Sequence, residues 1–183
     1  MRFNKLSLTI AIVILIAAAP AAIAQDSNAA KAHALVDAAI KMTDSNRAVK
    51  LLWQATDIDP SLEEPYIYLG MYYQSKEDFD DLVKVYQKLA KNQPNLESAW
   101  LNVGEAYMNF TPPKTKEALP YYRRAYEINP NSSAAALRIG EILAEQGNRD
   151  EAIKFLHQAT ADRSKNPHNA EEAQKVLTQM GAS

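Results

Sequence analysis

The chain has no cysteine among its 183 residues and only three histidines, His33, His157 and His168. The absence of cysteine excludes disulfide bonds, thiol catalysis and zinc sites with cysteine ligands. None of the histidines has a second histidine or a carboxylate at the spacing of a recognisable metal-binding motif. We therefore expect neither a metal nor a cofactor.

An excess of positive charge is also missing. Lysine and arginine total 20 residues against 22 aspartates and glutamates, which gives a formal net charge of −2. A protein that binds nucleic acid usually carries a basic excess, so this class is disfavoured. The hydrophobic fraction of 47% and the charged fraction of 23% are typical of a soluble globular chain. The sequence indicates one domain with a partner other than nucleic acid.

Catalytic motifs are absent as well. No serine stands in a nucleophile elbow, no HExxH occurs, and no glycine-rich phosphate loop is present. The acid pairs Glu63–Glu64, Asp80–Asp81 and Glu171–Glu172 are adjacent in sequence, so their side chains point to different sides of a helix. We predict that the protein is not an enzyme.

The first 24 residues have the three parts of a secretory signal. Arg2 and Lys5 give a positive start, residues 6–19 carry no charge, and Ala22-Ile23-Ala24 provides small residues before a cut. We predict cleavage after Ala24. A cysteine-free exported chain fits a bacterial periplasm better than a eukaryotic secretory route, where small domains tend to be disulfide-rich.

The predicted mature chain is residues 25–183, as one domain that is periplasmic or secreted. An uncleaved anchor is the alternative, because the uncharged residues 6–24 nearly reach the ~20 residues that a membrane span needs. In that case the protein would be a membrane-anchored accessory subunit.

Two landmarks recur along the rest of the chain at one period. Three glycines are spaced by 34 and 36 residues, and so are three prolines: Gly70, Gly104 and Gly140, and Pro60, Pro94 and Pro130. Two independent landmarks that keep one period indicate internal repeats. In the third repeat, large and small residues follow at helical spacing on two successive helices: Trp100, Val103, Gly104 and Tyr107, then Ala118, Tyr122 and Ala125.

This pattern resembles the tetratricopeptide repeat, W-x2-L-G-x2-Y followed by A-x3-F and P over ~34 residues. The resemblance implies an all-α right-handed solenoid of about four helix-turn-helix units with a C-terminal capping helix. The predicted units are residues 29–60, 61–94, 95–130 and 131–166, and the capping helix spans about 168–180.

The same resemblance assigns the repeated aromatics to the core rather than to a ligand cage. These are Tyr66, Tyr73, Tyr86, Trp100, Tyr107 and Tyr122. The glycines at 70, 104 and 140 are predicted to let the two helices of a unit approach closely, because they have no side chain.

In the resembled family, the first helices line a concave groove that holds a peptide or a partner's helix. Carried onto this chain, the groove positions form an apolar floor with a few polar side chains. They are Ile67, Tyr68, Met71, Leu101, Asn102, Glu105, Met108, Leu137, Arg138 and Glu141. The alternative is a tight superhelix in which these residues contact one another.

Some family members clamp a C-terminal carboxylate with lysine, asparagine and arginine side chains. Asn102 and Arg138 match two of those positions, whereas Ile67, Met71 and Ala134 stand at others and cannot donate a side-chain hydrogen bond. We therefore predict no binding of this kind.

The resemblance implies a non-catalytic scaffold of the bacterial cell envelope that binds a protein partner in the groove. One alternative is a self-assembling, homo-oligomeric module. Another is an enzyme or small-molecule binder, which would have to use Asn102, Glu105, Arg138 and Glu141, the only polar groove cluster.

Overall fold

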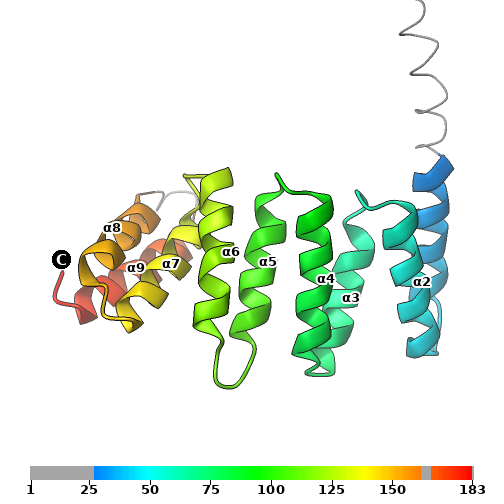
Figure 1. Cartoon of the computed structure of the whole chain (residues 1–183), viewed down its shortest axis with the longest axis horizontal. Helices are drawn as coiled ribbons and strands as arrows, with labels where there is room; N and C mark the ends of the chain where they lie inside the picture. The colour runs from blue at the N-terminus through cyan, green and yellow to red at the C-terminus, as the bar shows by residue number, and fades with distance from the viewer. Residues whose placement is uncertain (1–26, 162–165, 183) are drawn as a thin grey trace, which may run out of the picture. The chain divides into compact units, whose positions relative to one another are not determined.

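The computed structural model describes residues 27–161 and 166–182. Within these ranges all regular structure is helical and no strand occurs (Figure 1), which confirms the all-α prediction. The predicted signal peptide, residues 1–24, lies outside the described residues. None of the described helices combines the length and the apolar character that crossing a membrane requires.

The helices follow one another in pairs, with one further helix at the end. The first spans residues 27–40. It is followed by α2 (Ser45–Ile58), α3 (Glu64–Ser75), α4 (Phe79–Asn92), α5 (Glu97–Met108), α6 (Thr115–Ile128), α7 (Ser133–Glu145), α8 (Arg149–Thr160) and α9 (Pro167–Gln179).

Contacts between Cα atoms divide the chain into two compact units, and the division falls inside α3. The first unit ends at Leu69 and the second spans Gly70–Ser183.

In the first unit, each helix buries one face. Val36 of helix 27–40, Leu52 of α2 and Leu69 of α3 are at most 5% exposed. The side chain of Asp44 caps the start of α2 by accepting hydrogen bonds from two backbone N–H groups at 3.0 and 3.1 Å. Such a cap satisfies donors that the helix itself leaves unpaired.

In the second unit, each helix from α4 to α9 packs against the next, and α9 also packs against α7. Figure 1 shows α5 and α6 side by side, joined by a loop. Glycine allows this close approach. A Cβ built at Gly104 would lie 2.5 Å from Cε1 of Tyr122, and one at Gly140 would lie 2.7 Å from Cγ of Leu156. The prediction for these glycines is thus confirmed.

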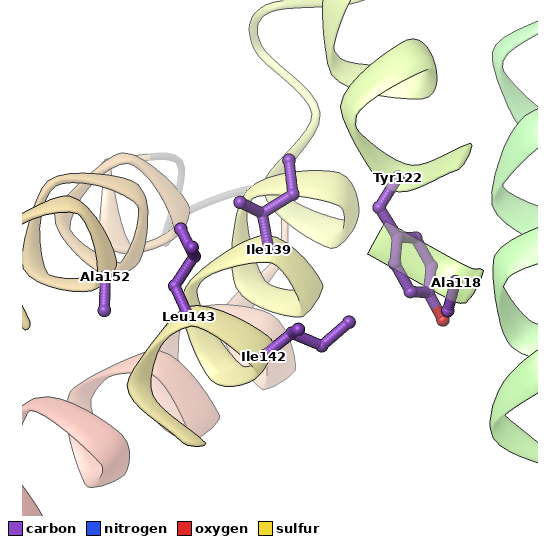
Figure 2. Close-up of a cluster of buried hydrophobic side chains, with 6 residues drawn as sticks. All are labelled: Ala118, Tyr122, Ile139, Ile142, Leu143 and Ala152. Atoms are coloured by element: carbon purple, nitrogen blue, oxygen red, sulfur yellow. The ribbon is translucent and has the colours of Figure 1, made fainter. Parts of the chain in front are cut away.

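One core cluster of the second unit lies between α6, α7 and α8 (Figure 2). Each of its members is at most 1% exposed: Ala118, Tyr122, Ile139, Ile142, Leu143 and Ala152. The α7 members follow at helical spacing of three and one, so the sequence period itself directs them to this core. The cluster holds α6 and α7 at the spacing on which the site described below depends.

The last helix, α9, repeats the pattern of α7 at a distance of 34 residues. Its buried Ala170, Ala173 and Leu177 stand 34 positions after Ala136, Ile139 and Leu143. Both helices end at a glycine with a left-handed backbone, Gly147 with φ of 78° and Gly181 with φ of 67°. The predicted C-terminal helix is therefore present. Its buried positions and its terminal glycine match those of the first helix of a repeat.

The aromatic side chains divide into two groups. Tyr66 and Tyr122 are fully buried, as predicted. Trp100 is only partly buried, because its ring stacks on Tyr121 at a centroid distance of 6.2 Å while its Nε1 donates to the exposed turn carbonyl of Pro94. Tyr121 in turn stacks on the half-buried Tyr107 at 5.6 Å. Tyr107, Tyr73 and Tyr86 are partly buried and pack against the core cluster that contains Leu82 and Ala106, whereas the core prediction is wrong for Trp100.

Candidate partner-binding face

Three of the four polar side chains predicted for the groove, Glu105, Arg138 and Glu141, form one ion-pair network in the second unit. Arg138 of α7 donates from Nε to Oε1 of Glu105 on α5 at 2.8 Å, and from Nη2 to Oε2 at 3.1 Å. Its Nη1 donates to Oε2 of Glu141, one turn further along α7, at 3.1 Å. One guanidinium thus links two successive first helices through a two-point contact with a carboxylate.

The network continues into the core. The hydroxyl of Tyr122 on α6 donates to Oε1 of Glu105 at 2.9 Å. Burial, followed by the negative charge of Glu105, raises the pKa of this hydroxyl well above its usual value. For Arg138, burial opposes the charged form, but the two carboxylates outweigh it and the pKa of the guanidinium is raised. Both groups therefore keep their protons at neutral pH.

These residues line a pocket of about 350 Å³ between α5, α7 and α9. Its lining residues are Glu105, Ala134, Leu137, Arg138, Glu141, His168, Asn169 and Glu172. Asn169 of α9 donates from Nδ2 to Oγ of Ser133 at 3.1 Å, which holds the start of α9 beside the start of α7. The pocket therefore has fixed walls on three helices.

The predicted apolar floor is only partly open in this unit. Leu137 is 5% exposed, because α9 covers it and places Leu177 in the same core cluster. Leu101 and Met108 pack partly against the cluster between α6, α7 and α8. The assignment of Leu137 to an open floor was wrong, and the accessible part of this face is mainly polar.

The groove positions on α3 behave differently. Ile67 is 53% exposed and Met71 is 61% exposed, whereas Tyr68 is half-buried. Ile67 and Met71 are four residues apart, so both lie on one side of α3. This helix presents apolar side chains, while α5, α7 and α9 present charged and amide groups.

Three pocket residues were missed in the sequence: His168, Asn169 and Glu172 all come from α9. The missed signal was the 34-residue step that relates Arg138 to Glu172. Extending the repeat by one more first helix would have placed α9 beside α7.

Arg138 is not free to clamp a partner's carboxylate, because both sides of its guanidinium are already engaged. Within the described ranges, no group of three or more histidine, aspartate or glutamate side chains has a metal-binding arrangement.

A family model described as tetratricopeptide repeat matches residues 114–179, the segment from the start of α6 to the end of α9. A thermophilic repeat protein of Thermus thermophilus superposes with a TM-score of 0.56 at 20% identity, covering 82% of this chain and 83% of that one. Residues 114–179 belong to the tetratricopeptide repeat family. The all-α fold of tetratricopeptide repeats predicted from the sequence is thus confirmed.

Other solved tetratricopeptide repeat structures share the fold. YrrB, described as having an unusual peptide-binding site, gives a TM-score of 0.57 at 23% identity over 80% of this chain and 76% of its own. The TPR2B domain of yeast Sti1, solved in complex with pHsp70, gives 0.55 at 22% identity over 63% of this chain and 92% of its own.

Curated relatives are much longer proteins. Anaphase-promoting complex subunit 3 of Schizosaccharomyces pombe is 25% identical over 116 residues, which are 63% of this chain and 17% of the relative. The peroxisomal targeting signal receptor of Candida glabrata is 26% identical over 116 residues, 63% of this chain and 18% of the relative. The repeat protein therefore spans less than a fifth of the length of these relatives.

Proposed function

We propose that this tetratricopeptide repeat protein is a non-catalytic scaffold that binds a segment of a protein partner on its first-helix faces. The observation that carries the proposal is the place of the exposed apolar side chains. Among the described residues, the large hydrophobic side chains with high exposure are Ile40, Met42, Ile67 and Met71. Ile67 and Met71 lie on α3, Ile40 ends helix 27–40, and Met42 follows two residues later.

Exposed apolar side chains of this size are typical of a surface that a partner covers. Methionine in particular suits a contact surface, because its flexible thioether adapts to the shape of the partner. The two relatives named as a receptor and as a complex subunit, and the peptide-binding site named for YrrB, support a protein partner. Extended or helical segments are the usual ligands of such grooves.

We also propose that the protein works in the bacterial cell envelope, as a periplasmic or secreted chain. The support is the composition of residues 1–24 together with the absence of cysteine. Mass spectrometry of the protein from cells would give a mature N-terminus at Gln25. A chain that retains residues 1–24 and fractionates with membranes would contradict cleavage and favour the anchored form.

Site-specific photocrosslinking in intact cells tests the scaffold function. The probe replaces Met71 on α3, and the matched control probe replaces Lys154, an exposed residue on the second helix α8. We expect a discrete heavier adduct from position 71 and none from position 154. An adduct at the mass of two copies would support self-assembly instead, and equal adducts at both positions would contradict a specific face.

A further inference from the structure

We propose that the pocket between α5, α7 and α9 receives a lysine or arginine side chain of the partner segment. This inference rests on the proposed function and specifies the chemistry of the partner. It is carried by the balance of charges in the pocket together with the apolar surface that lies beneath them.

The charge balance of the pocket is negative. Its lining contains the carboxylates of Glu105, Glu141 and Glu172 and one guanidinium, that of Arg138. Arg138 donates to both oxygens of Glu105 and to one oxygen of Glu141, so its charge is compensated within the pocket. With these contacts made, Arg138 has too few free N–H groups to attract a second anion. The carboxylates of the lining outnumber the guanidinium, and this excess of negative charge favours a cation.

Glu172 provides the carboxylate with the most freedom. It forms an ion pair with Lys175 at 3.5 Å, three residues along α9, where the two side chains are 40% and 64% exposed. A pair of this kind contributes little because both partners stay solvated. Lys175 itself does not line the pocket. Glu172 can therefore turn to a partner's cation at small cost.

The uncharged part of the lining fits the stem of a basic side chain. Leu137 is 5% exposed and lies with Ala134 among the charged residues of the pocket. Lysine and arginine bury an aliphatic stem against apolar surface while the charged end contacts polar groups. The apolar part of the lining, chiefly the half-buried Ala134, is complementary to the stem, and the carboxylates are complementary to the charged end. An acidic side chain would meet like charges, and a purely apolar one would leave the carboxylates unpaired.

The test uses the full ¹⁵N-labelled chain and small probes in place of the unidentified partner. The cationic probes are the N-acetyl, N-methylamide derivatives of lysine and arginine. The matched controls are the same derivatives of norleucine, which has a similar stem without charge, and of glutamate. We expect the cationic probes alone to shift the amide signals of residues around Arg138, Glu141 and Glu172 in a saturable way.

Two variants locate the effect. Glu172→Gln removes one exposed pocket carboxylate. It should weaken the binding of the lysine probe about fivefold, the change in affinity expected for a loss of ~1 kcal/mol. The matched control is Glu171→Gln, an exposed neighbour on α9 outside the pocket lining, which should leave binding unchanged. The amide spectrum of each variant reports directly whether it is folded.

Several results would overturn the inference: equal shifts from norleucine, stronger shifts from glutamate, no saturable shift from either cation, or equal weakening by both variants. The outcome is separate from that of photocrosslinking at Met71. An adduct at Met71 without probe binding would refute the basic side chain and leave the scaffold function standing. Probe binding without any adduct would support the pocket and contradict the scaffold function.

Discussion

The guanidinium of Arg138 binds both carboxylate oxygens of Glu105, which lies 33 residues earlier on the neighbouring first helix. Since Glu105 also accepts from Tyr122, one carboxylate joins α5, α6 and α7. The same contact thus holds neighbouring helices together and places charged groups in the pocket.

Replacing Arg138 by lysine should destabilise the protein modestly. Lysine keeps the charge but cannot make the two-point contact with Glu105. The side chains of Arg138 and Glu105 are 38% and 42% exposed, so we expect a loss of ~0.5–1 kcal/mol in the free energy of unfolding. Urea denaturation measures it. The control is Arg124→Lys, because Arg124 pairs with Glu127 within one exposed helical turn at 2.9 Å. If this control lost as much free energy of unfolding as Arg138→Lys, the contact of Arg138 with Glu105 would have no special role in stability.

The stability contributed by Tyr122 should depend on alkaline pH. Burial, and then Glu105, raises the pKa of Tyr122 in the folded protein above the ordinary value of 10.0. The folded state holds the proton more tightly than the unfolded state, so this contribution is complete below the unfolded pKa and is lost as pH rises above it.

The measurement compares the wild type with Tyr122→Phe by urea denaturation. At neutral pH the wild type should be more stable by ~1 kcal/mol, the typical net value of one hydrogen bond within a protein. Above about pH 10 its advantage should fall by up to ~1.4 kcal/mol per pH unit. All other side chains are common to the two proteins, so their contributions cancel in the difference. An advantage that stays constant through this range would contradict the raised pKa.

Gly104→Ala should destabilise the protein by ~1–3 kcal/mol through overpacking. The new Cβ would lie 2.5–2.8 Å from three ring carbons of Tyr122, which is fully buried and has no room to withdraw. Thermal unfolding measures the loss. At Gly147 a Cβ meets nothing within 4 Å, and only its φ of 78° opposes a side chain. Gly147→Asn should therefore cost less than Gly147→Ala, whereas Gly104→Asn should cost more than Gly104→Ala.

Leu177→Ala should cost ~2–5 kcal/mol, because the side chain is fully buried in the cluster that joins α9 to α7 and α8. Hydrogen exchange should quicken in α9 and at the covered Leu137. Thr178→Ala, at the exposed neighbouring position, should stay within ~0.5 kcal/mol of the wild type. If the two variants were equally stable, α9 would not be part of the packed core.

The recurrent spacing of Gly104 and Gly140 was sufficient to predict the fold. Where two helices cross too closely for a side chain, glycine is required, and it therefore recurs at the same position of successive repeats. The predicted apolar floor failed at Leu137 for a different reason. Whether that leucine is open depends on what packs over it, and the covering helix lies some thirty residues further on. Helical periodicity places a residue on one face of its own helix, and the neighbour that covers Leu137 follows only from the 34-residue step that relates α7 to α9.

The pairing of Arg138 with Glu105 was also beyond the sequence. Both residues were assigned to the same face, but their contact depends on the rotation of α7 against α5, which core packing at Tyr122 and Ile139 determines. The ring stack of Trp100 on Tyr121 has the same origin. In each case the missing information is the geometry between two packed helices.

The 34-residue correspondence between α7 and α9 places Gln174 where Gly140 stands in the preceding helix. At Gly140 the backbone of α8 comes within reach of a single methyl group, with the carbonyl oxygen of Ala152 3.3 Å from a built Cβ. A glutamine at that place holds any incoming helix off by the length of its side chain. A helix placed on that face of α9 therefore could not pack with the close fit that α8 has on α7.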